Sequence, residues 1–285
     1  MKILRNFSLK GYSTMRLLAS GAEIYEPENL DELRDVVCRL ASQGSPFHLL
    51  GAGSNVVFAE RVASPIVSLM KVDTRMEDLG GGKIRAGCST RIQHLIRFAQ
   101  TLGYGGIEYL FSLPASVGGC VFMNAGRGEE MGCAIVNVLE EVELLDIGTG
   151  EVLRERVDPS AFGYRVSPYQ KRACVVLGAT FRLAAQPREE TELLIRERLE
   201  TSKKWLDAKL PSCGSVFCRG NRFIFRLFRW LHPKSGGLAF SSKTSNWIGN
   251  HGGGTLTDFK RLTAKMERAH RFLGQTCKLE IKVFE

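Results

Sequence analysis

The chain has 285 residues, 44% hydrophobic and 24% charged, which is typical of a soluble globular protein large enough for two modest domains. No run of about 18 apolar residues occurs, so the sequence predicts no membrane-spanning segment and no membrane partner. The formal net charge is +9. The basic residues are scattered apart from a local excess between Arg219 and Lys243, which argues against a nucleic-acid partner and favours a nucleotide-sized anion.

The cysteines give information about the compartment and about metals. Eight are present, without a C-x-x-C pair or metal-ligand spacing, and the N-terminus has no apolar core of a signal peptide. We therefore expect reduced thiols, no metal site and a cytoplasmic location.

The first hundred residues predict alternating strands and helices. Residues 22–45 favour a strand, a proline turn and a helix capped by Asn29 and ended by Gly44, because apolar residues recur there at helical spacing. Residues 46–55 predict a strand that enters a glycine turn. Further strands are expected within 64–70 and 81–89, and a helix is expected from a Ser89 or Thr90 cap to Gly103.

The rest of the chain predicts a β-hairpin over 138–157, a strand over 173–183 and a charged amphipathic helix over 188–210. A helix over 256–273 and a final strand over 277–285 follow. From about residue 187 onward we expect a separate unit.

The turn "GAGSN" (Gly51–Asn55) has two interpretations. It can be a tight turn alone, or it can bind an anion, because backbone without large side chains lets several N–H groups point at a phosphate. It lacks the spacing of a Walker A loop and of the Rossmann fingerprint.

A second glycine-rich segment runs from Gly103 to Gly128 and mixes seven glycines with large apolar residues. Such a mixture is unfavourable in a core strand and too apolar for a surface loop. It indicates either backbone pressed against a large flat ligand or an irregular buried turn.

Five motifs occur in an order that resembles the UDP-N-acetylenolpyruvoylglucosamine reductases: "LGAGSNVV", "GYGGIEYLFSLPASVGGCVFMNAG", "FGYRVSPYQ", "PSCGSVF" and "LEIKVF". The similarity covers nearly the whole chain. It implies an α+β fold, with a two-subdomain FAD-binding domain of the vanillyl-alcohol-oxidase type at 1–186 (about 1–70 and 71–186). A substrate-binding domain at 187–285 would follow. It also implies NADPH as electron donor and a UDP-sugar substrate, with no obligatory protein partner evident.

The resemblance also implies the site residues. The pyrophosphate of FAD would lie on the turn Gly51–Asn55, and the flavin would lie along the second glycine-rich segment. The implied FAD contacts are Gly51, Ala52, Gly53, Ser54, Asn55, Pro114, Ser116, Val117, Gly118, Gly119, Asn124, Ala125 and Gly126.

The implied catalytic set is Ser215, Arg165 and Glu280. Ser215 would protonate the substrate carbon, Arg165 would pair with the substrate carboxylate, and Glu280 would help to polarise it. Taken alone, each of the three is an ordinary turn or surface residue. Tyr164 would contact the flavin or substrate, or belong to the core.

The last strand allows two registers. "EIKVF" aligns Glu280 with the family's glutamate, whereas anchoring on the Leu279–Glu280 pair places Lys282 at that position. We favour Glu280, because its register also aligns the apolar residues that follow.

The sequence departs from the family pattern after Ser215, where "CRG" (Cys218–Gly220) and a bulky basic stretch up to about residue 234 replace the usual residues, and at Thr244. Of the subclasses of this family, the one with the shorter chain matches the sequence best. The alternatives are a flavoprotein of the same fold with another substrate, and a non-catalytic nucleotide-binding module.

Overall fold

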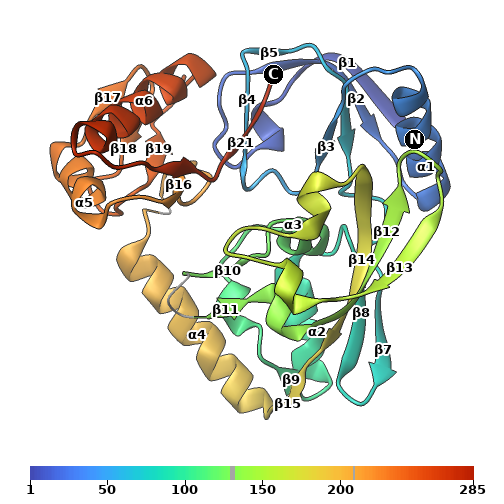
Figure 1. The fold of residues 1–285 in the computed structure, drawn as a ribbon. Helices are drawn as coiled ribbons and strands as arrows, with labels where there is room; N and C mark the ends of the chain where they lie inside the picture. Colours follow the sequence, from blue (N-terminus) through green and yellow to red (C-terminus); the bar gives the residue numbers. More distant parts are fainter. Residues whose placement is uncertain (129–131, 208) are drawn as a thin grey trace. The chain divides into compact units, whose positions relative to one another are not determined.

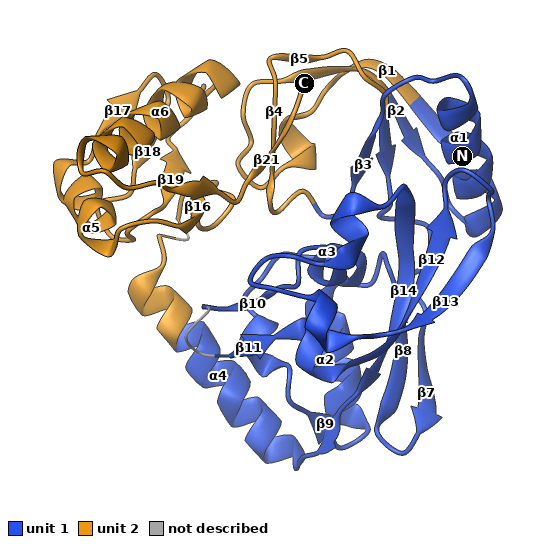
Figure 2. Cartoon of the chain, viewed as in Figure 1, with its two compact units in different colours: residues 1–3, 24–52, 66–200 blue, residues 4–23, 53–65, 201–285 orange. Residues whose placement is uncertain are grey.

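The computed structural model describes residues 1–128, 132–207 and 209–285. They form two compact units (Figure 2): unit 1 comprises residues 1–3, 24–52 and 66–200, and unit 2 comprises residues 4–23, 53–65 and 201–285. The unit boundary after Glu200 lies within a helix and differs from the domain boundary predicted after residue 186. The compact units are defined by packing, whereas the predicted domains are defined by the ligand that each would bind. The division into an FAD-binding domain and a substrate-binding domain therefore stays a prediction.

Unit 1 contains a five-stranded antiparallel sheet in the order β13-β12-β14-β8-β7. Its strands are β7 (Met76–Gly80), β8 (Lys83–Gly87), β12 (Leu139–Asp146), β13 (Val152–Arg156) and β14 (Cys174–Arg182). The helices are α1 (Leu30–Ser42), α2 (Ile92–Thr101), α3 (Val117–Phe122) and most of α4 (Arg188–Trp205). A parallel group of β3 (His48–Leu50), β6 (Ile66–Ser68) and the end of β2 (Ser20–Glu26) packs with α1. The short strands are β9 (Tyr104–Gly105), β10 (Gly126–Arg127), β11 (Cys133–Ala134) and β15 (Ala184–Ala185).

The strand β14 lies between β12 and β8 in the sheet of unit 1 (Figure 1). It is buried on both faces and joins two cores of the unit. Val175 and Leu177 pack in the core around α1, whereas Val176 and Phe181 pack in the core that contains α2 and α3. Because neighbouring side chains of a strand point to opposite faces, one continuous apolar strand supplies both cores.

The local signals explain α1 but not the start of α2. The Asn29 side chain accepts the Glu32 N–H at 3.0 Å, and Gly44 follows the helix with φ +65°, so both predicted ends of α1 are confirmed. The predicted Ser89 or Thr90 cap of α2 is wrong. Arg91 stands at that position without a side-chain cap, because Ser89 Oγ donates to Leu69 O and accepts from Asp73 N–H.

The hairpin β12–β13, strand β14 and helix α4 confirm three further predicted elements. Helix α4 ends at Trp205 rather than at the expected residue 210, and Ala208 of that prediction lies outside the described residues.

Unit 2 combines two early segments with the last part of the chain. It contains most of β1 (Lys2–Ser8), the start of β2, β4 (Val56–Phe58), β5 (Arg61–Val62) and, after Thr201, the remaining elements. These are β16 (Phe217–Arg219), α5 (Arg222–Leu231), β17 (Lys234–Ser235), β18 (Leu238–Phe240), β19 (Ile248–Asn250), α6 (Leu256–Phe272), β20 (Lys278–Leu279) and β21 (Lys282–Phe284). Helix α6 packs on β17, β18 and α5.

The predicted helix 256–273 is confirmed, and it begins with a capping box in which Thr255 and Asp258 satisfy each other's backbone N–H groups. The single strand predicted over 277–285 is wrong in one respect. It is broken into β20 and β21 at Glu280 and Ile281, because β20 pairs antiparallel with β16 while β21 pairs parallel with β4.

Candidate active site

In unit 1, the two glycine-rich segments lie together. A Cβ added to Gly51 would be 3.1 Å from Ser116 Oγ, and one added to Gly119 would be 3.4 Å from the same atom. Ser116 is buried and caps α3 by accepting the Gly119 N–H at 3.4 Å. The end of β3 and the start of α3, 65 residues apart in sequence, are therefore neighbours, and both approach with bare backbone.

The backbone donors of these two segments differ in their availability. Three successive N–H groups at the start of α3 are already bonded within unit 1: Val117 to Thr90 O, Gly118 to Cys88 O and Gly119 to Ser116 Oγ. Within the described part of the chain, the N–H groups of Gly51–Asn55 donate to no protein acceptor. Donors for an anion are thus present on the turn, whereas the start of α3 offers a packing surface.

Arg165 lies at the tip of a tight turn. Gly163 and Val166 exchange two backbone hydrogen bonds of 3.0 Å, which places Tyr164 and Arg165 at the two central positions. Arg165 has φ +59°, a conformation that glycine adopts without strain at this turn position and that arginine rarely adopts. Its guanidinium carbon lies 5.1 Å from the centre of the Tyr164 ring.

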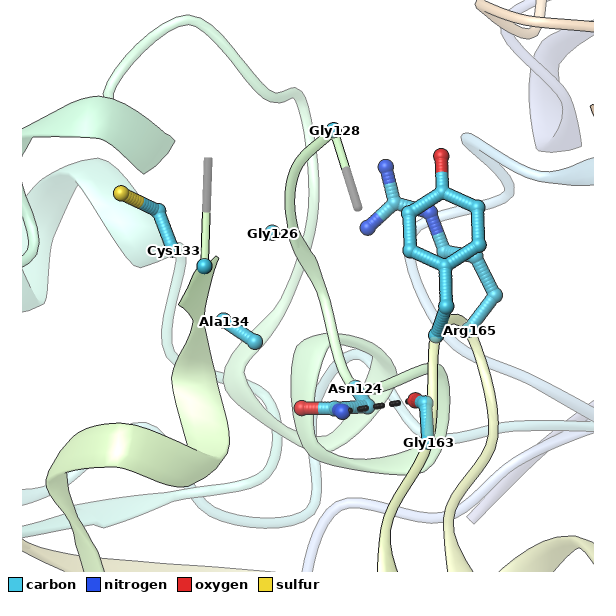
Figure 3. A pocket seen from close by; sticks show the side chains of 9 residues that line it. Asn124, Gly126, Gly128, Cys133, Ala134, Gly163 and Arg165 are labelled. Carbon is cyan, nitrogen blue, oxygen red and sulfur yellow. Dashed lines mark hydrogen bonds between the residues drawn. The ribbon is translucent and has the colours of Figure 1, made fainter. Parts of the chain in front are cut away.

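Hydrogen bonds from neighbouring side chains hold the strained turn in place. The Gln170 amide donates to Arg165 O at 3.1 Å and to Phe122 O at 2.8 Å, and Ser167 Oγ donates to Phe122 O at 2.7 Å. Buried Asn124, itself at φ +43°, donates to Gly163 O at 2.8 Å (Figure 3). The end of α3 and the turn therefore support each other.

These residues enclose a pocket of about 180 Å³ in unit 1 (Figure 3). Four predicted site residues line it: Asn124, Gly126, Tyr164 and Arg165. The rest of the described lining consists of Gly128, Gly132, Cys133, Ala134 and Gly163. The small lining residues leave backbone accessible, and the guanidinium of Arg165 supplies a positive charge at one side.

In unit 2, Gly53 is required by a close backbone approach. It has φ +68°, and a Cβ added to it would lie 1.9 Å from Tyr12 O. Thr14 N–H donates to Gly53 O at 3.1 Å. No other residue fits this position without moving the segment around Tyr12.

Ser215 is exposed and follows Gly214, which has φ +78°. It forms an isolated bridge with Trp247. The next two residues are clamped by Asn246, because Val216 N–H donates to Asn246 O, and the Asn246 side chain accepts from Phe217 N–H and donates to Phe217 O. This clamp fixes the backbone that presents the Ser215 hydroxyl.

Glu280 lies next to the strand that follows Ser215. Its N–H donates to Val216 O at 2.9 Å, and its carbonyl accepts from the Asn55 side chain at 3.2 Å. Lys282 N–H donates to Asn55 O at 2.9 Å, but the Lys282 side chain is exposed, whereas that of Glu280 is half-buried. Ile281 is buried, as alternation along the strand predicts. Unit 2 therefore brings together Ser215, Asn55 and Glu280, and Arg165 belongs to unit 1.

The carboxylate of Glu280 also influences a cysteine. Burial and the negative charge of Glu280 raise the pKa of the Cys218 thiol, which donates to Lys278 O at 3.4 Å. Cys218 is therefore a protonated thiol at neutral pH.

Several positioning residues escaped the sequence analysis. Gln170 and Asn246 act on backbone groups that are close in space, and the pocket residues Cys133 and Ala134 belong to β11, a short strand without a clear strand pattern in the sequence. Gln170 stands in the motif "FGYRVSPYQ", which marked the segment, and Asn246 at φ +58° had no signal of its own.

Comparisons with known proteins identify the family of the chain. Residues 22–156 match a family described as FAD binding domain. The chain is 32% identical to a UDP-N-acetylenolpyruvoylglucosamine reductase of Pelobacter propionicus, with 85% of this chain and 82% of that protein covered. A reductase of the same name from Synechococcus is also 32% identical, covering 92% and 84%. The chain belongs to the UDP-N-acetylenolpyruvoylglucosamine reductase family.

A solved structure supports this membership. The crystal structure of the UDP-N-acetylenolpyruvylglucosamine reductase of Thermus caldophilus superposes with a TM-score of 0.80 at 25% identity, and all of both chains is covered. The predicted family, α+β fold class and FAD cofactor are thereby confirmed. Among the described residues, no helix of this family member combines the length and apolarity needed to cross a bilayer.

Proposed function

We propose that the chain is an FAD-dependent reductase that uses NADPH to convert UDP-N-acetylglucosamine enolpyruvate to UDP-N-acetylmuramate for peptidoglycan synthesis. The observation that carries the proposal is the 32% identity to reductases of that name along 85% to 92% of the chain. The match to the FAD binding domain family supports it, and so does the glycine turn, where Gly53 leaves its backbone without a side chain.

The turn Gly51–Asn55 fits the pyrophosphate of FAD. Its N–H groups donate to no acceptor in the described protein, and the nearby backbone of Tyr12 leaves no room for a side chain at position 53. When bound, FAD supplies the hydride chemistry that links NADPH oxidation to substrate reduction. We infer that Val117–Gly119 contribute packing against the cofactor, since their N–H groups already have protein acceptors.

The proposed catalytic roles follow from charge and hydrogen-bonding capacity. Arg165, held in its strained turn, pairs with the substrate carboxylate and stabilises the negative charge that develops there. Ser215 gives its proton to the neighbouring substrate carbon. Glu280, held beside the segment that follows Ser215, polarises the carboxylate of the substrate. The domain division at residue 186 and the contact of Tyr164 with flavin or substrate belong to the same proposal.

The proposed partners are small molecules, a UDP-sugar and NADPH, without nucleic acid or an obligatory protein partner. We also propose a cytoplasmic location. The ground for this location is the sequence, whose eight cysteines show no C-x-x-C pair and no metal-ligand spacing.

An anaerobic two-step experiment tests the function. NADPH should bleach the yellow purified protein, and UDP-N-acetylglucosamine enolpyruvate should restore the colour. Bleaching without recovery would favour a flavoprotein with another substrate, and a yellow protein that NADPH leaves unchanged would favour a non-catalytic module.

A further inference from the structure

The positive charge of the chain is concentrated in its last part. Residues 201–285 contain 16 Lys and Arg against 5 Asp and Glu, whereas residues 1–200 contain 23 against 25. No acidic residue occurs between Asp207 and Asp258. The net charge of +9 therefore arises from this region, which carries +11 by itself.

Helix α5 lies within this basic region and has more apolar surface than its packing uses. Ile224, Phe225 and Phe228 are buried in the core of unit 2. Phe223 is 70% exposed and Trp230 is 78% exposed, although both are large aromatic residues. With Leu227, at 37%, they recur at positions i, i+4 and i+7, so they form one stripe along the outside of the helix.

A second stripe runs beside the first. Arg222, Arg226 and Arg229 have the same spacing, displaced by one residue. Neither Arg226 nor Arg229 has an acidic side chain within salt-bridge distance in the described ranges 1–128, 132–207 and 209–285. The exposed side of α5 is thus divided lengthwise into an aromatic half and a cationic half.

The helix is rigidly anchored. Asn221 caps it, and its backbone N–H donates to His270 Nε2 at 2.9 Å, while its side chain donates to Gln275 Oε1 at 2.8 Å. These bonds join the start of α5 to the end of α6, where Phe272 is 90% exposed. The two stripes are therefore preformed, and binding through them costs little ordering entropy.

We propose that α5 docks unit 2 onto the surface of an anionic phospholipid bilayer, with the aromatic stripe in the headgroup region and the arginines on the lipid phosphates. Aromatic and aliphatic residues beside Lys or Arg on one helix are typical of interfacial helices. A second copy of this chain fits less well, because a symmetric contact would bring together two copies of the same strongly basic region. The surface contact differs from the expectation of no membrane partner, which rested on the lack of a spanning segment.

Vesicle sedimentation of the full-length, FAD-loaded protein tests the proposal. The protein should sediment with vesicles of phosphatidylglycerol and phosphatidylcholine, and much less with phosphatidylcholine alone. Arg226→Gln with Arg229→Gln should weaken binding about thirtyfold, given roughly 1 kcal/mol per cation near an anionic surface. Phe223→Ser with Trp230→Ser should reduce binding at least as strongly.

The matched control is Leu193→Ser with Trp205→Ser, a pair on α4 with comparable exposure of 55% and 59%. This pair should leave binding unchanged. Circular dichroism and flavin content would show that each variant is folded.

Tryptophan emission reports insertion directly. In the Trp205→Phe/Trp247→Phe protein, Trp230 is the remaining tryptophan, and its emission should shift to the blue with anionic vesicles. Three results would overturn the proposal: unchanged binding after loss of Phe223 and Trp230, vesicle binding without a Trp230 shift, or a dimer in solution that the α5 changes convert to monomer.

Discussion

Arg165 occupies a backbone conformation that is unfavourable for any residue with a side chain, at φ +59°. The left-handed region costs about 1–2 kcal/mol for such residues. Because Gln170 and the Gly163–Val166 hydrogen bonds maintain it, the strain is stored in the folded unit. Stored strain at a charged residue that lines a pocket is consistent with a function for that residue.

Arg165→Gly should therefore abolish activity without lowering the stability of the protein. We expect the free energy of unfolding to stay equal or to rise by about 1 kcal/mol, since relief of strain outweighs the entropy of an added glycine. Substrate reduction should be lost. Chemical denaturation and steady-state assays measure the two quantities, and Arg165→Lys is the control that keeps the charge without the planar fork. A variant that is less stable and fully active would contradict both roles.

Ser215→Ala tests the proton donor. Flavin reduction by NADPH should remain near normal, whereas reoxidation by substrate should slow by about a hundred- to ten-thousandfold. Stopped-flow absorbance resolves the two half-reactions. Ser215→Cys should retain partial activity, and Ser212→Ala in the same segment should be nearly silent. Equal slowing of both half-reactions would instead indicate a role in folding or flavin binding.

The paired substitutions Glu280→Gln and Lys282→Met test the register of the last strand. Glu280 is half-buried beside the segment that follows Ser215, whereas Lys282 is exposed. The rate of substrate reduction should therefore fall steeply in Glu280→Gln and only slightly in Lys282→Met. Flavin content should persist in both proteins. The reverse pattern would place Lys282 at the catalytic position and favour a different substrate.

At the scale of an element, the glycine turn between β3 and β4 depends on backbone geometry rather than on side-chain chemistry. Gly53→Val should expel the flavin, because its Cβ would lie 1.9 Å from Tyr12 O. Gly44→Val is the matched control: Gly44 has nearly the same φ, +65°, but open space around it. The ratio of flavin to protein absorbance after purification measures the effect. Full flavin content in the Gly53 variant would place the pyrophosphate elsewhere.

At the scale of the whole molecule, a charge cluster in unit 1 should govern acid stability. Arg85 lies 2.9 Å from Asp73 and 2.7 Å from Glu143. The Arg85 hydrogen bond lowers the pKa of Glu143; burial opposes the ionisation of Asp73, but hydrogen bonds from Arg75 and Arg85 outweigh it and lower its pKa as well. Both carboxylates thus bind protons more weakly in the folded state than in the unfolded state.

The sign of the pH effect follows from these shifts. The stabilisation is complete above the ordinary carboxylate pKa values of about 4 and is lost as pH falls through the lowered folded values. Thermal unfolding should therefore show a Tm that drops below about pH 4.5. In Glu143→Gln the Tm should be lower at neutral pH and should fall less on acidification, whereas exposed Glu77→Gln should behave like the unchanged protein. An acid profile unaffected by Glu143→Gln would exclude this cluster as the cause.

Local sequence determined the elements whose signals lie within a few residues. The spacing of Leu33, Val36, Val37 and Leu40 and the Asn29 cap specify α1, and the hairpin at 139–156 follows from its alternation around a glycine turn. The five motifs also determined the family and its cofactor, because they are long and occur in order.

Tertiary structure decided what depends on distant partners. Ser89 does not cap α2, because Leu69 and Asp73 engage its hydroxyl, and the last strand breaks at Glu280 because β16 and β4 pair with its two halves. Asn55 reaches Glu280 across 225 positions of sequence. Such contacts have no local periodicity, since each depends on where another segment packs, and so the sequence could name Asn55 and Glu280 but not bring them together.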